Sequence, residues 1–361
     1  MRLRSVYRAL LGVSLACAAP SLSRTVQAAD AACPNPRQMQ GFRTCADVAA
    51  AEQEGELLVY STDPEVAQQR LLAAFHAAFP KIKPNFLRLQ AGALYAKMLA
   101  ERQGRIYAPD VVQLSDMSFA ADFLKRGGYM HYVSPEMAAY KAEYKSKPEG
   151  YWSWGAITIA GIAYNPGLVT EAEAPRTYRD LLDPRWTDNI SVKVTISGLQ
   201  HVTWYVIRGL HGPEYWETFA RLKPHAFDSY VQQFDRLVSG QDKVVMTAQY
   251  SGYLIMKEKG APVVFVNPPE GVIASPQPYG LVKEAPHPQA ARLYMDWFLG
   301  VPGQTAVARS LYYHSPRADV PPPPGGEPIA AFKLLFPEDW DAFQATHAAY
   351  VREWNKLIGL R

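Results

Sequence analysis

Three short polar segments stand where the sequence pattern changes from strand to helix. The side chains of the first two, which are hydroxyls and one carboxylate, are suited to hydrogen bonding. Ser61 and Thr62 follow the apolar run 57–60, and Ser115 and Asp116 follow the strand-like run 110–114. Such groups at the carboxyl ends of neighbouring parallel strands are typical of a ligand-binding site. The alternative is that they only cap the helices that follow, as Ser, Thr and Asp often do.

The third segment, Ser197 and Gly198, separates a predicted strand at 191–196 from a helix that begins near Gln200. Backbone N–H groups at a helix N-terminus have no partner within the helix, and together with a serine hydroxyl they favour a bound oxyanion. The alternative is an ordinary strand-to-helix turn. We predict that Ser197 and Gly198 hold the acidic group of a ligand.

Tyr250 and Tyr253 are three residues apart, so they face the same way if this stretch is helical. With Asp116 they would supply three anionic oxygens, the ligand type that a hard trivalent ion such as Fe³⁺ requires. A tyrosine on a half-buried helix otherwise belongs to the core. We predict both tyrosines as ligand-binding residues. No metal site and no cofactor are expected, with Fe³⁺ as an alternative ligand at Tyr250, Tyr253 and Asp116.

Several function classes lack support in the sequence. It contains no Gly-x-Ser-x-Gly, His-Glu-x-x-His, glycine-rich phosphate loop or paired-cysteine metal motif, so we expect no enzyme. The 37 basic and 34 acidic residues are interspersed and leave a net charge of only +3. Without a basic block or an aromatic-basic array, nucleic acid is not an expected partner.

Predicted strands and helices alternate along the first part of the chain, and they position the polar segments named above. The pairs are 57–60 with 65–79, 83–89 with 94–103, and 110–114 with 119–126. This alternation favours an α/β fold with a parallel sheet covered on both faces. Asp63 before Pro64 is expected to cap the first of these helices.

The chain is longer than one hydrophobic core usually covers, so we expect two lobes. Apolar strands at 157–164 and 263–266 flank a middle block with its own strand and helix units, and they are predicted to be the two crossover strands of a hinge. Lobe 1 then comprises 55–164 and 263–320, and lobe 2 comprises 165–262. A Pro-rich linker and an amphipathic C-terminal helix, expected to pack on one lobe, make up 321–361.

The first residues predict export. Three arginines precede an apolar stretch at 9–20, and small residues near Ala29 suit a leader peptidase, so 1–29 is predicted to be a signal peptide of a periplasmic protein. Cleavage before a lipidated Cys17 is the alternative. Cys33 and Cys45 would be the only cysteines of the mature chain. We predict a disulfide between them in the N-terminal extension, 30–54.

Five short motifs follow one another at the intervals of a known family. They are Glu54-Gly55-Glu56-Leu57-Leu58-Val59-Tyr60-Ser61, Ala108-Pro109-Asp110-Val111-Val112, Ala163-Tyr164-Asn165-Pro166, Leu182-Asp183-Pro184-Arg185-Trp186 and Ile196-Ser197-Gly198. In this order the chain resembles the ferric-ion-like periplasmic binding proteins from about residue 54 to 320. The resemblance implies the type 2 periplasmic binding protein fold, in which two α/β lobes close on a ligand.

The resemblance also implies partners and a ligand class. Such proteins deliver a small molecule to the permease of an ABC importer with its ATPase, and we expect a monomer. Iron-binding members use two adjacent tyrosines and a histidine of the first loop, whereas this chain has Tyr250 followed by Ser251, and Asp63-Pro64 in place of the histidine. The anion-binding loop is kept. A ligand with a phosphonate, phosphate or carboxylate group is therefore favoured; the alternatives are a ferric-ion-binding protein, and an enzyme or a receptor-partner sensor on the same fold.

Overall fold

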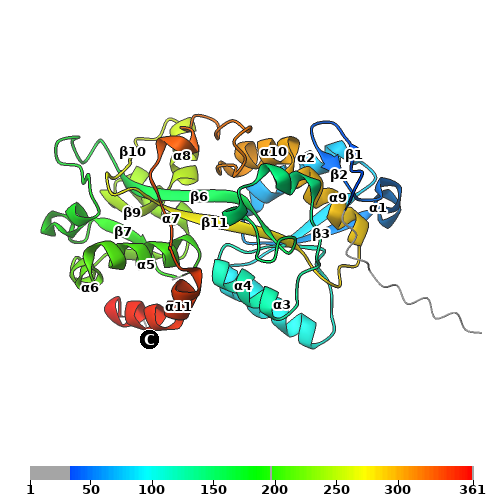
Figure 1. Cartoon of the computed structure of the whole chain (residues 1–361). Helices are drawn as coiled ribbons and strands as arrows, with labels where there is room; N and C mark the ends of the chain where they lie inside the picture. Colours follow the sequence, from blue (N-terminus) through cyan, green and yellow to red (C-terminus); the bar gives the residue numbers. More distant parts are fainter. Residues whose placement is uncertain (1–32, 196, 360–361) are drawn as a thin grey trace, which may run out of the picture. The chain divides into compact units, whose positions relative to one another are not determined.

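The computed structural model describes residues 33–195 and 197–359, drawn in colour in Figure 1. The predicted signal peptide, Cys17 and Ile196 lie outside the described residues. The three predicted strand and helix pairs of the first part are present as β3 (Glu56–Ser61) with α2 (Glu65–Ala78), β4 (Lys83–Arg88) with α3 (Ala91–Gln103), and β5 (Val111–Gln113) with α4 (Met117–Lys125). The α/β class is thereby confirmed.

One sheet runs through both halves of the described chain. Its strand order is β4-β3-β5-β11-β6-β9-β7-β8, where β11 is Val272–Leu281, β6 is Ser153–Tyr164, β9 is Val244–Gln249, β7 is Ile190–Lys193 and β8 is His225–Phe227. The pairs on either side are parallel: β3 with β4 and β5, and β7 with β8 and β9. The two central strands, β6 and β11, are antiparallel to each other and to β9 and β5 respectively.

The second crossover strand is β11, and the prediction of 263–266 for this role is wrong. That segment does form a strand, β10 (Val264–Val266), but it pairs with the end of β6 alone among the described strands. β11 pairs with β6 on one side and with β5 on the other. Pro276 and Pro278 break its apolar pattern, and proline normally argues against a central strand. A register shift between Gln277 and Pro278 accommodates them.

The helices pack in groups around the two ends of this sheet, and β6 and β11 run between the groups (Figure 1). One group is α1 (Val48–Glu54), α2, α9 (Pro288–Leu299) and α10 (Val301–Leu311), whose core includes Phe75, Tyr294 and Trp297. Another contains α5 (Leu199–His211) and α6 (Glu214–Arg221), with Trp204 and Trp216 fully buried. Helices α7 (Tyr230–Ser239) and α8 (Tyr250–Glu258) flank β9.

Further short elements complete the described chain. They are strands β1 (Arg37–Gln38), β2 (Arg43–Thr44) and β12 (Leu334–Leu335), and 3₁₀ helices at Pro135–Ala139, Ala142–Tyr144, Arg179–Leu182, Pro184–Trp186 and Ile329–Ala331. No described helix combines the length and the apolar character that a membrane crossing requires.

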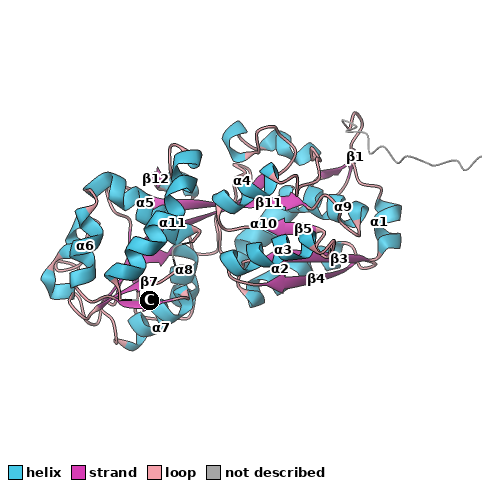
Figure 2. Cartoon of the chain, turned by 90° about the horizontal axis from the view of Figure 1, so that it is seen from below, coloured by secondary structure: helices cyan, strands magenta, loops and turns pink. Residues whose placement is uncertain are grey.

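The predicted C-terminal helix is present as α11 (Trp340–Leu357), beside α5 in Figures 1 and 2. Trp354 is fully buried, and its ring meets those of Trp204 and Trp216 edge-on at centroid distances of 5.1 and 5.7 Å. The helix also reaches the other side of the sheet, because Gln344 Nε2 donates to the Ser118 carbonyl of α4 at 3.3 Å. The expectation of packing on one lobe is therefore incomplete, since α11 contacts α4, which follows β5, as well as α5 and α6.

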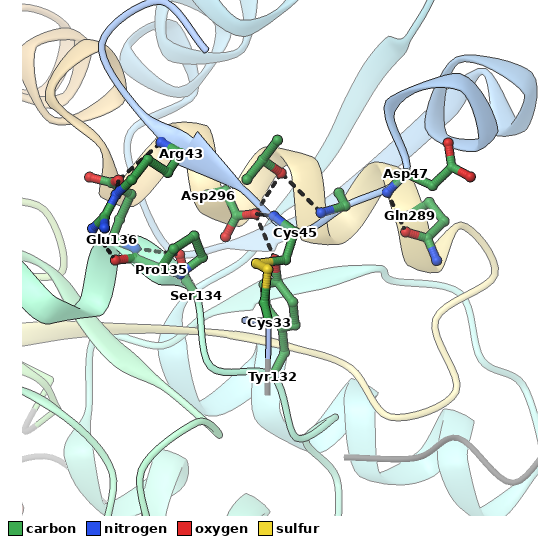
Figure 3. The surroundings of a disulfide bond; sticks show 12 residues. Cys33, Arg43, Cys45, Asp47, Tyr132, Ser134, Pro135, Glu136, Gln289 and Asp296 are labelled. Atoms are coloured by element: carbon green, nitrogen blue, oxygen red, sulfur yellow. Dashed lines mark hydrogen bonds and ion pairs between the residues drawn. A yellow bond between two sulfur atoms is a disulfide. The ribbon is translucent and has the colours of Figure 1, made fainter. Parts of the chain in front are cut away.

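The predicted disulfide is confirmed: Cys33 and Cys45 are bonded (Figure 3). Beside it, the Cys45 backbone N–H donates to Asp296 Oδ2 at 3.1 Å and the Tyr132 hydroxyl donates to the same oxygen at 2.6 Å. Arg43 forms an ion pair with the buried Glu136 at 3.2 Å. These bonds hold the N-terminal extension against α9, on the side of the sheet that carries β3.

Candidate ligand-binding site

A cavity of about 170 Å³ lies where strands from both halves of the sheet end. Its polar wall consists of side chains at or just beyond the ends of β3, β4, β5, β7, β8 and β9, together with two from the central strands. These are Thr62, Asp63, Arg88, Gln90, Ser115, Lys193, Ser197, Asp228, Ser229, Gln249, Thr158 and Gln277, with Tyr230 and Tyr313 beside them. The arrangement follows the rule that open α/β sheets bind ligands beyond the carboxyl ends of their strands.

The structure brings four of the eight predicted site residues to the cavity wall: Thr62, Ser115, Ser197 and Gly198. Two more, Ser61 and Asp116, are buried directly behind it and bond to residues of the wall. Tyr250 and Tyr253 do not line it. Their predicted ligand roles stay predictions.

The loop after β3 is held by a polar network beneath the cavity. The Thr62 N–H and hydroxyl both donate to Gln113 Oε1 at 2.7 Å, and Gln113 Nε2 donates in turn to Gln277 Oε1 at 2.8 Å. The Ser61 hydroxyl donates to Asp63 Oδ2 at 3.2 Å. Ser61 therefore positions the carboxylate of Asp63, which itself faces the cavity.

Asp63 does not cap the following helix, contrary to the expectation from the Asp-Pro pair. Helix α2 begins after Pro64 without a side-chain cap, and Asp63 Oδ2 instead accepts a hydrogen bond from the Tyr279 hydroxyl at 2.7 Å. Burial raises the pKa of this carboxyl to about 6, although the bonds from Tyr279 and Ser61 oppose the shift. The site thus contains a carboxylate that is costly to keep charged in the folded chain.

Two basic residues line the cavity, and the sequence reasoning missed both. Arg88 is the last residue of β4 and Lys193 the last residue of β7. Within the described part of the chain, neither forms an ion pair within 4.0 Å. Burial, with a contribution from Arg88, lowers the pKa of Lys193 to about 8, while Asp228 and Asp116 act in the opposite direction. Their positions at strand ends follow the same rule that selected Ser61 and Ser115.

Gly198 meets the loop after β5 at very close range. Its φ of +54° is one that side chains rarely adopt, and a Cβ here would lie 2.7 Å from the Ser115 carbonyl oxygen. Its N–H donates to Asp116 Oδ2 at 3.0 Å. This N–H is therefore engaged with Asp116 and does not point into the cavity, and the role of Ser197 and Gly198 in holding an oxyanion stays a prediction. The Ser197 hydroxyl remains on the wall for that purpose.

Asp116 connects the start of α4 with Gly198, the residue before α5. Its Oδ1 caps α4 by accepting from the Ser118 N–H at 2.9 Å, and its Oδ2 accepts from Gly198. Burial alone would raise the pKa of Asp116, but the nearby His201 and the bonds from Ser118 and Gly198 outweigh it and lower the pKa to about 2. The carboxylate thus stays charged while it joins α4 to the start of α5.

Tyr250 and Tyr253 belong to the packing between α8 and the C-terminal segment. The Tyr250 hydroxyl accepts from the Glu327 N–H at 3.0 Å, and its ring stacks on His314 at a centroid distance of 5.7 Å. The Tyr253 ring lies 5.4 Å from that of Phe265. The alternative Fe³⁺ set of Tyr250, Tyr253 and Asp116 is therefore not assembled at this cavity. Other oxygen donors do face it: Asp63, Asp228, Tyr230 and Tyr313.

A sequence profile of the family described as bacterial extracellular solute-binding proteins matches residues 106–342. Iron uptake protein A1 of Synechocystis sp. is 25% identical over 287 residues, which cover 74% of this chain and 78% of that protein. The similarity extends across most of both chains.

Solved structures share the fold at lower identity. Iron-bound HitA from Pseudomonas aeruginosa matches with a TM-score of 0.72 and 19% identity, over 84% of this chain and 99% of that one. The periplasmic binding protein AfuA from Actinobacillus pleuropneumoniae, solved with fructose-6-phosphate, matches with a TM-score of 0.74 and 21% identity, over 85% and 99%. These neighbours are two-lobed periplasmic binding proteins, as the sequence resemblance implied.

Proposed function

Because the chain belongs to the family of bacterial extracellular solute-binding proteins, we propose that it captures a small organic molecule with an acidic group in the cavity described above. A phosphonate, phosphate or carboxylate group is the part recognised. The protein would act in the periplasm as a monomer and deliver its ligand to the permease of an ABC importer that works with an ATPase.

The observation that carries this proposal is the pair of cations without carboxylate partners. Lys193 is only 8% exposed, and burial lowers its pKa although Asp228 and Asp116 favour the charged form, because neither carboxylate forms an ion pair with it within 4.0 Å. A ligand oxyanion between Lys193 and Arg88 would remove that cost and form charge-assisted hydrogen bonds. Hydroxyls of Ser115 and Ser197 stand on the same wall as further donors.

The carboxylates of the wall restrict the remainder of the ligand. Asp63 and Asp228 face the same cavity as the two cations, so a molecule with several negative groups would be repelled on one side. A single acidic group joined to hydroxyl or amino groups fits the wall better. The structure of AfuA with fructose-6-phosphate, one phosphate on a polyhydroxyl body, supports this ligand class for a similar fold.

Ferric ion is the second candidate, favoured by the similarity to iron uptake protein A1 and to iron-bound HitA. Asp63, Asp228, Tyr230 and Tyr313 offer oxygen ligands of the kind a hard cation needs. Against it, Arg88 and Lys193 would repel a trivalent ion unless an anion is bound with it. A ferric complex at this site would therefore need a companion anion.

Calorimetry of the purified protein tests both candidates with one set of probes: inorganic phosphate, fructose 6-phosphate, citrate and ferric citrate. We expect a phosphorylated or carboxylated probe to bind. Lys193→Gln and Ser197→Phe should each weaken that binding at least about tenfold, because one removes the buried cation and the other fills the cavity. Tyr253→Phe, which leaves the wall intact, is the matched control.

Two results would contradict the proposal. Equal affinities in wild type and Lys193→Gln would show that no ligand anion contacts this cation. A stoichiometric, coloured ferric complex that Tyr313→Phe abolishes would instead establish iron as the ligand. Mass spectrometry of any small molecule released on denaturing the exported protein identifies the natural ligand directly.

A further inference from the structure

Behind the cavity, three potential metal-ligating side chains from three different helices converge. Asp116 precedes α4, His201 lies in the first turn of α5, and His347 lies in the middle of α11. One ligand atom of each lies within 4.8 Å of those of the other two. None of the three lines the ligand cavity. The cluster is therefore separate from the proposed solute site.

The orientation of the His201 ring leaves one nitrogen aimed at a carboxylate. Thr346 Oγ1 donates its proton to the Phe343 carbonyl at 2.6 Å, so it must accept from His201 Nε2–H at 3.2 Å. The other nitrogen, Nδ1, is buried without a hydrogen-bond partner and lies 3.8 Å from Asp116 Oδ2. When this nitrogen carries no proton, two acceptor atoms face each other in a region closed to water, which is unfavourable unless a cation lies between them.

The separation of these two atoms suits a metal ion better than a proton. A hydrogen bond between a ring nitrogen and a carboxylate needs a distance of about 3 Å. Zn²⁺ forms bonds of about 2.0–2.2 Å to histidine nitrogen and carboxylate oxygen, so an ion placed to one side of the line joining the two atoms spans the 3.8 Å gap. A ligand atom of His347 lies within 4.8 Å of the other two, and the residue is half-buried rather than enclosed.

Neighbouring aromatic rings hold the two imidazoles in place. The His201 ring stacks on Phe343 with centroids 3.8 Å apart. The centroid of the His347 ring lies 4.9 Å from that of His201 and 6.0 Å from that of Phe119. Metal-binding side chains in proteins are typically held in a fixed orientation by their neighbours and surrounded by apolar groups. A neighbouring groove lined by Phe119, Ser197 and His347 offers an entry path from the surface.

We propose that Asp116, His201 and His347 form a site for a divalent transition-metal ion of the Zn²⁺ type. Two imidazoles and one carboxylate are the ligand chemistry that such ions prefer over Mg²⁺ or Ca²⁺. The ion would link α4, α5 and α11, and Asp116 already joins α4 to Gly198 of the anion loop. Metal binding would thus stabilise the contacts among these three helices without contacting the solute.

Calorimetry with Zn²⁺ alone, on the full exported protein after treatment with a chelator, tests the site. Wild type should bind one ion, and a Co²⁺-loaded sample should show visible d–d absorption. His347→Ala and Asp116→Asn should each weaken Zn²⁺ binding at least about tenfold, since each removes one of three ligands. Asp116→Asn keeps an acceptor oxygen for only one of the Ser118 and Gly198 N–H groups, so circular dichroism must first show that it folds. If this variant still fails to fold, His347→Ala carries the test alone.

Two controls separate ligation from other effects. His76→Ala removes an exposed histidine of α2, and Gln344→Ala removes the bond between α11 and α4 without removing a ligand. Both should bind Zn²⁺ as wild type does. Undetectable wild-type binding, or equal binding in wild type and His347→Ala, would overturn the proposal. Because no solute is present, this result is independent of whether the protein binds an organic anion.

Discussion

Gly198 is the residue at which backbone geometry and function are most closely joined. Its positive φ and the 2.7 Å approach to the Ser115 carbonyl oxygen leave no room for a side chain. A Gly198→Ala variant would have to adopt strained backbone angles, at a cost of about 1–3 kcal/mol, and would push the loop after β5 away. We expect a lower midpoint of thermal unfolding and weaker binding of the anion probe.

Gly209→Ala is the matched control for this variant. Gly209 lies in α5, with open space around the position of its Cβ and a φ outside the left-handed region. Alanine there should leave binding unchanged and stabilise the helix slightly. Equal effects of the two substitutions would show that the contact between Gly198 and Ser115 is not tight in solution.

Asp63 provides a prediction of pH dependence. Its folded pKa of about 6 exceeds the ordinary value of 3.8, so between these values the folded chain binds more protons than the unfolded chain. Stability contributed by Asp63 therefore falls as the pH rises through this window. Asparagine keeps an acceptor for the Tyr279 hydroxyl and has no charge. The free energy of unfolding of Asp63→Asn minus that of wild type should increase by about 2 kcal/mol between pH 4 and pH 7.

Urea unfolding of both proteins at the two pH values measures this difference, and effects of all other titrating groups cancel in it. A difference that does not change with pH would mean that Asp63 is not buried in the unliganded protein. Bound anions should be absent, because a ligand next to Arg88 alters the charge near this carboxyl.

At the residue scale, the sequence predicts the polar loop residues of the site better than its charged side chains. Ser115 and Ser197 were predicted because they stand between a predicted strand and a predicted helix, and both line the cavity. Lys193 was missed, since a lysine at a strand end normally points into solvent and only the tertiary fold buries it. Tyr250 was selected by resemblance to iron binders, and nothing local to it shows that its hydroxyl bonds Glu327.

Among the elements, α11 was predicted from the spacing of its aromatic residues, but its partners were not. The repeat of Phe343, Tyr350 and Trp354 fixes a helix with one apolar face. Which surface covers that face depends on residues far away in the sequence, here Trp204 and Trp216 of α5 and α6. Likewise, β11 could not be predicted locally, because Pro276 and Pro278 argue against a central strand. Only its pairing with β5 and β6 in the folded chain shows that it is one.

The packing of α11 can be tested through Trp354. Its ring is fully buried against the stacked rings of two other tryptophans, and its Nε1–H donates to the Val194 carbonyl at 2.8 Å. Trp354→Ala should reduce the free energy of unfolding by about 3–5 kcal/mol, the usual cost of removing a large core ring. Arg352→Ala changes an exposed residue of the same helix and should have an effect of about 0.5 kcal/mol or less.

Urea unfolding of the two variants gives the comparison. If Trp354→Ala is as stable as Arg352→Ala, α11 does not pack on α5 and α6 in solution. Circular dichroism would then show whether the helix itself survives.

For the whole molecule, the resemblance predicted the fold class, whereas the lobe limits at 55–164, 263–320 and 165–262 remain a proposal. The long strands β6 and β11 now take the crossover role, which shifts the second limit beyond β10. The cavity wall supports a hinge between lobes: Thr62 and Arg88 come from the side of β3 and β4, and Lys193 and Ser197 from the side of β7. A ligand that contacts all four would hold both sides together.

We therefore expect ligand binding to shorten the distance between the two sides. Spin labels at Ile106 and Leu210, which are 57% and 47% exposed, report it, because Ile106 lies beyond α3 and Leu210 lies near the end of α5. Labels at Ile106 and Val66 lie on the same side and serve as the control pair. Cys33 and Cys45 are bonded to each other and would not take up label.

With the tightest anion of the calorimetric panel, pulsed dipolar spectroscopy should show a shorter distance between Ile106 and Leu210 and an unchanged distance between Ile106 and Val66, since rotation about β6 and β11 moves the sides as rigid bodies. Two unchanged distances would mean that the ligand enters a cavity already formed, and that Lys193 stays buried whether or not an anion is bound.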